Sequence, residues 1–280
     1  MKISLITACY NSAATIRTAI ESVLSQKGVD IEYIVVDGGS TDGTVDIIKE
    51  YSTRSTRSTW LTFKWISERD EGMYDAINKG IKMATGDVVG ILNADDILAA
   101  DNTLATIAEV FSRKERKGRK EEGCGEAARS EVECVYADIR FVKSGDSVEE
   151  LRNAKTVRYC SAARWRPWMF RFAAMVPHPS FYARRECFDK LGMYSLDYRI
   201  CADFELVLRF LGIAKLPSVY LPKCVVVMRT GGASTAGWRS NVEINREDLR
   251  ALKANGVWSC LPLIYLKYLF KIWGFVFKRG

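Results

Sequence analysis

The first 110 residues alternate between two hydrophobic patterns, and this alternation restricts the fold more than any other feature of the chain. Residues 3–8 form an apolar run with β-branched side chains, after which Ile16, Ile20 and Leu24 recur at helical spacing. The same order returns three more times, in residues 31–51, 61–84 and 87–111. Four strand-plus-helix units in succession predict an α/β fold, with a doubly wound, mostly parallel sheet covered by helices.

Composition fits such a domain, since 48% of the 280 residues are hydrophobic and 27% are charged. The first strand pattern begins at Ile3, which leaves no room for a signal peptide, and the eight cysteines include no C-x-x-C pair. We therefore expect a cytoplasmic protein with reduced thiols. The net charge of +7 is concentrated in a mixed-sign segment, 112–122, and at the C-terminus, and we expect no nucleic-acid partner.

Polar side chains follow each of the four expected strands. In open parallel sheets, ligands bind outside the carboxyl ends of the strands. No G-x-G-x-x-G or G-x-x-x-x-G-K-[ST] motif is present, which argues against a dinucleotide fold and a P-loop ATPase. A ligand site at this edge is predicted all the same, because all four loops carry polar groups. In chain order these are Thr7, Tyr10, Asn11, Asp37, Asp70, Asn93, Asp95 and Asp96.

The adjacent carboxylates of Asp95 and Asp96 raise the question of what compensates their repulsion. A divalent cation would do so, and oxygen ligands suit Mg²⁺ or Mn²⁺, which usually bind through one or two carboxylates together with substrate phosphates. The alternative is a solvated turn that caps a helix. The apolar run before the pair and the three companion loops favour the cation.

Four motifs in order, TACYNS, VVDGGSTDGT, SERDEGMYDAINKG and LNADD, resemble the nucleotide-binding half of family 2 glycosyltransferases with the GT-A fold. The resemblance is dense over residues 1–100 and continues less densely to residue 255. It implies that a nucleotide diphosphate-sugar is the donor. The residues that it implies hold the nucleoside are Thr7, Tyr10, Asn11 and Asp37, with Asp37 near the base, while Asp70 and Asn78 line the nucleotide-sugar pocket.

The same resemblance places Asn93, Asp95 and Asp96 at the DXD-type motif of the family. It implies that Asp95 lies near ribose or phosphate and that Asp96 ligates the Mn²⁺ or Mg²⁺ ion bridging the diphosphate. The diphosphate's cation would then compensate the carboxylate pair.

Inverting glycosyl transfer needs one base to take the proton of the acceptor hydroxyl. The family places this base at the start of a helix, and Asp203 in CADFEL matches that position. His178, the only histidine, and Arg229 are expected as further acceptor or diphosphate contacts. The chain lacks the Q-x-x-R-W signature of processive members, so we expect addition of one sugar per encounter.

The C-terminal stretch, residues 258–280, is aromatic and aliphatic and has no acidic residue. At helical spacing Lys267, Lys271 and Lys278 form one narrow stripe, which is typical of a helix lying in the membrane interface. Packing on the protein's own core or on a second subunit is the alternative. Membrane association would suggest a lipid-linked glycan acceptor and a peripheral position on the inner face of the cell membrane.

We therefore expect a GT-A glycosyltransferase with an amphipathic C-terminal helix, acting in surface polysaccharide synthesis with a hexose or N-acetylhexosamine. A metal-dependent phosphohydrolase or nucleotidyltransferase, and a non-catalytic nucleotide-sugar binding protein, are the alternative classes. The expected parts are a nucleotide-sugar half at 1–111, a charged surface insertion at 112–131, an acceptor half at 132–255 and the membrane-interfacial tail at 256–280.

Overall fold

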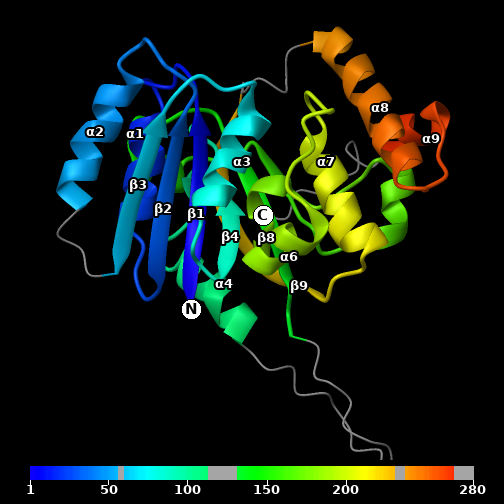
Figure 1. Ribbon diagram of the computed structural model, residues 1–280, viewed down its shortest axis with the longest axis horizontal. Helices are drawn as coiled ribbons and strands as arrows, with labels where there is room; N and C mark the ends of the chain where they lie inside the picture. Colours follow the sequence, from blue (N-terminus) through cyan, green and yellow to red (C-terminus); the bar gives the residue numbers. More distant parts are fainter. Residues whose placement is uncertain (56–59, 113–130, 231–236, 268–280) are drawn as a thin grey trace, which may run out of the picture.

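A computed structural model describes residues 1–55, 60–112, 131–230 and 237–267 (Figure 1). The expected insertion at 112–131 lies almost wholly outside the described residues, as does the tail beyond residue 267.

One nine-stranded sheet runs through the molecule. Its first half is parallel, in the order β3-β2-β1-β4, and consists of β1 (Lys2–Cys9), β2 (Asp30–Asp37), β3 (Leu61–Ser67) and β4 (Val88–Ile91). The register is level at the carboxyl ends, where Cys9 lies opposite Asp37 and Asp37 lies opposite Ser67. The loops that follow these strands therefore leave the sheet side by side.

The second half of the sheet is mixed rather than parallel. The strand β8 (Tyr182–Arg184) is antiparallel to both β4 and β6 (Cys134–Val142), and β9 (Ser218–Arg229) is parallel to β6. Two short strands, β5 (Ile97–Leu98) and β7 (Arg158–Cys160), pair antiparallel with β9 and β6. The acceptor half thus continues the sheet of the first half.

Helices cover both faces of the sheet, because successive strand residues point to opposite sides. Leu5 and Tyr33 belong to a core under α1 (Ile16–Leu24), α2 (Thr44–Ser55) and α4 (Thr103–Ser112). Ile6 and Ile34 belong to a second core that includes residues of α3 (Met73–Met83), and Figure 1 shows α3 in front of the sheet. The four strand-plus-helix units and the doubly wound arrangement are therefore confirmed.

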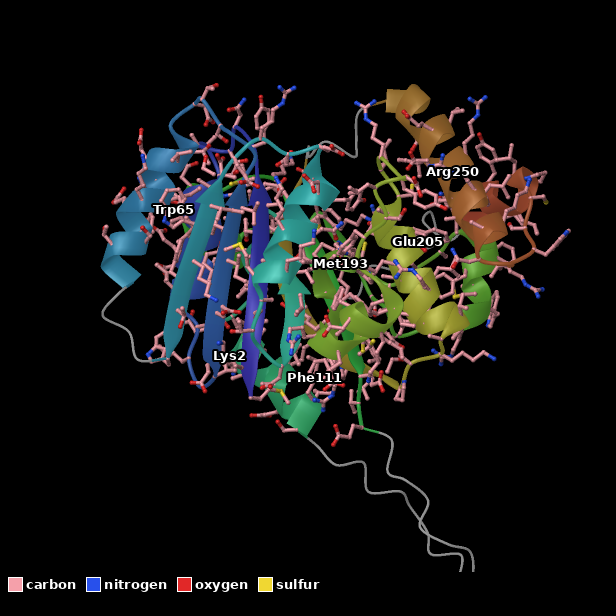
Figure 2. The ribbon with its side chains drawn as sticks, in the orientation of Figure 1. Lys2, Trp65, Phe111, Met193, Glu205 and Arg250 are labelled. Carbon is pink, nitrogen blue, oxygen red and sulfur yellow. The ribbon has the colours of Figure 1, made fainter. Side chains whose placement is uncertain are left out.

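The second core also unites the C-terminal elements. Its members come from α6 (Arg185–Leu191), α7 (Ala202–Val207), the 3-10 turn η1 (Pro167–Phe172), the π-helical turn η3 (Leu208–Ile213), α8 (Gly237–Ala254) and α9 (Leu261–Tyr265). The remaining elements are α5 (Val148–Asn153) and the turn η2 (His178–Ser180). Figure 2 places Lys2 at the edge of the sheet opposite the carboxyl ends of its strands, and Arg250 on α8 at the far end of the molecule from α2.

Candidate active site

A hollow of about 490 Å³ opens at the carboxyl ends of β1, β2 and β3. The tyrosine in its lining is 64% exposed, so a large aromatic surface is available to a ligand. The lining residues are Tyr10, Gly38, Gly39, Arg69, Asp70 and Gly72. The structure therefore brings together Tyr10 and Asp70, two of the residues expected to contact the donor.

Gly38 is a glycine because Asp70 occupies the space of a side chain. A Cβ atom at Gly38 would lie 2.4 Å from Oδ2 of Asp70, which is closer than real Cβ contacts. The other oxygen, Oδ1 of Asp70, accepts a hydrogen bond of 3.0 Å from the backbone N–H of Gly72. The Asp70 carboxylate is thereby held against the second loop at the mouth of the hollow.

Asp37 is entirely buried and its oxygens are used by its own loop. Oδ2 accepts from the backbone N–H groups of Gly39 and Ser40 at 3.1 and 3.0 Å, and from the Ser67 hydroxyl at 2.7 Å. Burial alone would raise the pKa of Asp37, but the hydrogen bonds from Ser40 and Ser67 lower it, so the carboxylate is ionised. Asp37 thus shapes the loop that lines the hollow, and its direct contact with a nucleoside stays a prediction.

Asn11 joins the first loop to the second. Its backbone adopts a φ of 49°, its N–H donates to the Ser40 hydroxyl at 2.7 Å, and its Oδ1 accepts from the N–H of Thr41 at 2.9 Å. Asparagine tolerates this left-handed conformation better than most residues. Asn11 therefore fixes the loop that carries the exposed Tyr10.

Thr7 and Asn78, two further residues expected to contact the donor, are not among the residues that line the hollow, so their contact with a donor stays a prediction. Thr7 is entirely buried on the face of the sheet that α1 and α4 cover, and its Oγ1 accepts the Tyr33 hydroxyl at 3.0 Å. Asn78 is buried under the second half of the chain, where Nδ2 donates to the Tyr194 carbonyl at 2.8 Å and Oδ1 accepts the Tyr194 N–H at 3.0 Å. Asn78 thereby positions Tyr194.

The acidic turn after β4 separates its two carboxylates. Asp95 is partly exposed, whereas Asp96 is entirely buried. Asn93 Nδ2 donates to Oδ2 of Asp96 at 2.8 Å, and Oδ1 of Asp96 has no partner among the described residues. Burial, and then the charge of Asp95, raise the pKa of Asp96 well above its usual range. The more open carboxylate of the pair is that of Asp95, and ligation of a metal by Asp96 stays a prediction.

Arg229, at the end of β9, forms hydrogen bonds that fix the acidic turn. Its guanidinium donates to the Asp95 carbonyl at 2.5 Å, to the Thr18 hydroxyl at 2.9 Å and to the Gly145 carbonyl at 3.2 Å. The question of what compensates the two carboxylates therefore has a partial answer within the chain. The Asn93 amide donates to Asp96, and the guanidinium of Arg229 lies against the turn.

A divalent cation fits this turn only if a substrate supplies further ligands. Within the described ranges, no group of three or more His, Cys, Asp or Glu side chains could hold a metal ion. Mg²⁺ and Mn²⁺ commonly bind through one or two carboxylates plus substrate phosphates. Asp95, whose side chain is partly exposed, meets that requirement.

Asp203 lies in the first turn of α7 and is partly buried. Its Oδ1 accepts the Phe204 N–H at 2.7 Å and lies 3.3 Å from the Tyr74 hydroxyl. Burial raises the pKa of Asp203 to about 6. A carboxylate with a pKa near neutrality is suited to general base catalysis.

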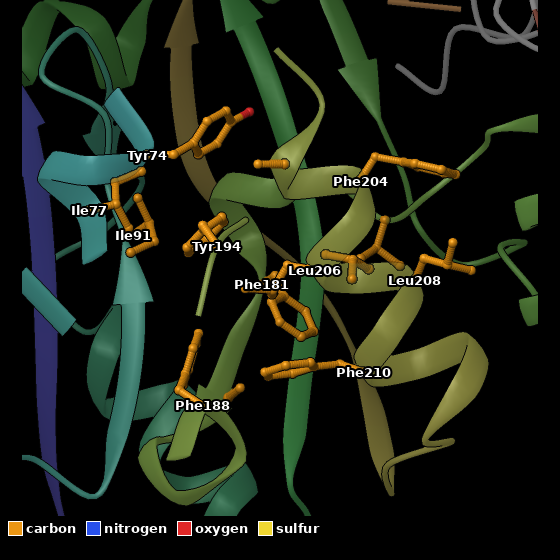
Figure 3. Close-up of a cluster of buried hydrophobic side chains, with 14 of the residues drawn as sticks. Tyr74, Ile77, Ile91, Phe181, Phe188, Tyr194, Phe204, Leu206, Leu208 and Phe210 are labelled. Atoms are coloured by element: carbon orange, nitrogen blue, oxygen red, sulfur yellow. The ribbon is translucent and has the colours of Figure 1, made fainter. Parts of the chain in front are cut away.

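Tyr74 contacts this carboxylate, and Tyr194 packs against Tyr74. Tyr74 of α3 donates to the Ile200 carbonyl at 2.5 Å and stacks on Tyr194 with ring centroids 5.6 Å apart (Figure 3). The Tyr194 hydroxyl lies 2.6 Å from Nε2 of His178, whose pKa burial lowers to about 4. His178 is therefore a neutral, buried partner of Tyr194, and its contact with acceptor or diphosphate stays a prediction.

The sequence pattern missed Tyr194 and Glu247 as parts of the site. Glu247 of α8 accepts the backbone N–H groups of Arg199, Ile200 and Cys201 at 2.9 to 3.0 Å, which fixes the loop before α7. These contacts join segments far apart in the sequence, so no local spacing could indicate them. For Tyr74 the sequence held one indication: it lies one helical turn before Asn78 on α3, so the two side chains are neighbours on that helix.

The described start of the tail packs on the protein. Nζ of Lys267 lies 2.6 Å from Oδ2 of Asp248 on α8, and both side chains are buried. Ile264 is buried as well. The expectation that Lys267 faces lipid is therefore wrong, while Lys271 and Lys278 lie outside the described residues. In the part of the chain that the structure describes, no helix is long and apolar enough to cross a membrane.

Comparison with known proteins gives consistent results. The sequence model of "Glycosyl transferase family 2" matches residues 4–118. A PGL/p-HBAD biosynthesis glycosyltransferase of Mycobacterium tuberculosis is 28% identical over 251 residues, which cover 89% of this chain and 83% of that protein. An uncharacterized glycosyltransferase of the same species is 30% identical over 210 residues, which cover 74% of this chain and 68% of its own.

Solved structures show the same fold. A mannosyltransferase of Pyrobaculum calidifontis in complex with GDP-Man and Mn²⁺ superposes with a TM-score of 0.62 at 20% identity, over 95% of this chain and 68% of that chain. TarS of S. aureus in complex with UDP-GlcNAc superposes with a TM-score of 0.61 at 17% identity, over 90% of this chain and 66% of that chain. The present chain covers only 40% of the length of a longer solved TarS chain.

Proposed function

Because this chain belongs to glycosyltransferase family 2 and has the GT-A fold, we propose that it is a metal-dependent, inverting enzyme that transfers one sugar from a nucleoside diphosphate-sugar to a hydroxyl. The observation that carries the proposal is the contact between Tyr74 and Asp203. The helix of Tyr74 begins immediately after the hollow that ends at Gly72, so this contact joins a candidate base to a candidate donor site.

The donor's nucleoside would lie in the hollow, against the exposed ring of Tyr10 and the carboxylate of Asp70. Aromatic faces stack on nucleobases, and a carboxylate accepts hydrogen bonds from base or ribose donors. Asp37 and Asn11 hold the two loops in place through the hydrogen bonds described above. The hollow is thus preorganised by groups that the ligand does not need to displace.

Asp95, with Asn93, would hold a Mn²⁺ or Mg²⁺ ion that offsets the negative charge of the leaving diphosphate. Asn93 also fixes the turn, since its amide donates to Asp96. Asp96 would act beneath the surface as a neutral support for the turn.

Asp203 would take the proton of the acceptor hydroxyl, because its carboxylate is mostly ionised above a pH of about 6. The acceptor oxygen then forms a bond to the anomeric carbon while the bond from that carbon to the diphosphate breaks. The proton ends on Asp203, and the electron pair of the broken bond leaves with the nucleoside diphosphate. One displacement of this kind inverts the anomeric configuration.

The proposed acceptor is a lipid-linked glycan in surface polysaccharide synthesis, and the sugar a hexose or N-acetylhexosamine. The name of the mycobacterial relative states PGL/p-HBAD biosynthesis, so that relative supports a role for this chain in glycoconjugate biosynthesis. We place the enzyme on the inner face of the cell membrane, in contact with it through residues 258–280. No described feature favours phosphohydrolysis or nucleotidyl transfer over this activity.

The test compares wild type with Asp203→Asn in a transfer assay with Mn²⁺, a panel of nucleoside diphosphate-sugars and lipid-linked acceptors. We expect Asp203→Asn to lower the transfer rate at least about a hundredfold. Asp189→Asn is the matched control, because Asp189 is exposed on α6 and pairs only with Arg185 among the described contacts. Transfer by Asp203→Asn at the wild-type rate would contradict the assignment of the base.

A further inference from the structure

Two segments of the chain contain no acidic residue, residues 151–185 and residues 249–280. The first contains the sequence RWRPWMFR, in which arginines alternate with large aromatic side chains. In the fold, these segments contribute η1 and α9, which pack against each other. The hydroxyl of Ser259 donates to the Arg171 carbonyl at 2.6 Å and ties the two segments together.

The turn η1 has a buried side and an exposed side. Trp165 and Phe170 are buried with ring centroids 5.2 Å apart, and Nε1 of Trp165 donates to the Ala174 carbonyl at 3.0 Å. Trp168, between them in sequence, is 59% exposed. The exposure of Trp168 is therefore imposed by a turn that its neighbours anchor on both sides.

The partner segment exposes aromatic side chains too. Trp258 is 69% exposed and Tyr265 is 45% exposed, although Ile264 beside Tyr265 is fully buried. We call the exposed side chains of Arg164, Trp168, Arg171, Trp258 and Tyr265 the cationic aromatic face.

The inner side of η1 reaches the candidate base. The ring of Phe170 packs edge-on against Phe204 with centroids 5.9 Å apart, and Phe204 directly follows Asp203 in α7. The same short turn thus carries Trp168 outward and contacts the helix of the base inward. Binding of this turn to a membrane would therefore fix the distance between Asp203 and the lipid headgroups.

We propose that the cationic aromatic face docks on an anionic lipid bilayer. Tryptophan and tyrosine favour the membrane-water interface, and arginines are attracted to anionic headgroups. Because both segments carry arginines or lysines and no acid of their own, their charge is complementary to such lipids and unfavourable for a basic partner. This inference deepens the proposed membrane association by assigning it to η1 as well as to the tail, and it requires no transferase activity.

The experiment is sedimentation of the full chain with phosphatidylcholine vesicles, with and without phosphatidylglycerol, at low salt. The test variant is Arg164→Gln with Arg171→Gln. Arg166 is retained, because its guanidinium donates to the carbonyls of Ala163 and Trp165 and stabilises the turn. The matched control is Lys27→Gln with Lys49→Gln, which also removes two exposed charges but from the end of the molecule near α1 and α2.

We expect wild type and the control to bind phosphatidylglycerol vesicles alike and the test variant to bind roughly thirtyfold more weakly, from about 1 kcal/mol per arginine. Trp168→Ser, a change at an exposed position, should also weaken binding, and thermal unfolding at the wild-type temperature would show that each variant folds. Wild-type binding that both changes leave intact would overturn the role of η1 and leave the tail as the membrane contact. No vesicle binding by wild type would overturn the inference and the membrane part of the proposed function. The transferase activity would still be tested separately by the transfer assay.

Discussion

The hydroxyl of Tyr74 lies 3.3 Å from Oδ1 of Asp203, although 129 residues separate them in the sequence. Tyr74 belongs to α3, which begins at the donor-side hollow, and Asp203 lies in the first turn of α7 of the acceptor half. The pair is therefore the point at which the two halves of the chain meet at the proposed site of chemistry.

Replacing Tyr74 with phenylalanine should move the pH dependence of transfer. The Tyr74 hydroxyl lowers the pKa of Asp203 against the stronger effect of burial, which raises it to about 6. Without the hydroxyl, the pKa rises further, so the acidic limb of the kcat profile shifts to higher pH by about half a unit to one unit. The measurement is the transfer rate between pH 5 and 8, and a limb that stays in place would contradict the coupling.

Replacing Asp203 with asparagine should stabilise the fold while it abolishes transfer. The folded pKa of about 6 is above the unfolded value of 3.8, so the ionised carboxylate is less favourable in the folded protein. This cost is full above pH 6 and disappears as the pH falls through 6 toward 3.8. We expect Asp203→Asn to raise the free energy of unfolding by about 2 kcal/mol at pH 7.5 and by much less at pH 4, measured by denaturant titration. Equal effects at both pH values would contradict the prediction.

A methyl group at Gly38 should act through Asp70. The added Cβ would lie 2.4 Å from Oδ2 of Asp70, so Gly38→Ala must displace that carboxylate from the hollow. We expect donor affinity to fall about tenfold with little loss of stability. The control is a double-mutant cycle: in an Asp70→Ala background the Gly38→Ala change should have little further effect. Additive losses would show that the methyl group acts elsewhere.

Glu32, at the edge of the sheet opposite the site, makes the stability of the fold depend on pH. It is fully buried, and burial would raise its pKa, but hydrogen bonds from Lys64, Ser4 and Thr85 lower it to about 2. Its contribution, about 3 kcal/mol, is present above the unfolded pKa of 4.5 and is lost as the pH falls toward 2.

Unfolding of Glu32→Gln, followed by denaturant titration, should therefore be less pH-dependent between pH 5 and 2.5 than that of wild type. The control is Asp30→Asn, on the same strand at an exposed position. A wild-type slope in Glu32→Gln would contradict the role of the buried carboxylate.

Much of the fold was predictable from hydrophobic period, because the four strand-plus-helix units bury continuous apolar faces. The site was predictable only in part. Tyr10 and Asp70 were recognised and do line the hollow. Thr7 does not line the hollow, and the sequence could not show this, because both faces of a doubly wound sheet are buried and alternation along a strand cannot tell which face carries the ligand.

The remaining differences between the sequence expectations and the structure arise from burial and from contacts between distant segments. Asn78 and His178 are polar residues whose partner, Tyr194, lies far from Asn78 in sequence, and only the folded chain shows that they are satisfied. Lys267 fitted an amphipathic stripe in the sequence, but in the fold it forms a buried ion pair with Asp248 of α8. Asp96 differs from Asp95 by its burial alone, which the sequence does not record.

The most direct test of the donor site is calorimetric titration with UDP and GDP, with and without Mn²⁺, of wild type, Asp95→Asn and Asp96→Asn. We expect wild type to bind one nucleoside diphosphate at least about tenfold more tightly with Mn²⁺, Asp95→Asn to lose that enhancement, and Asp96→Asn to keep it. Failure of folded wild type to bind either diphosphate, or loss of the Mn²⁺ effect in Asp96→Asn alone, would contradict the account.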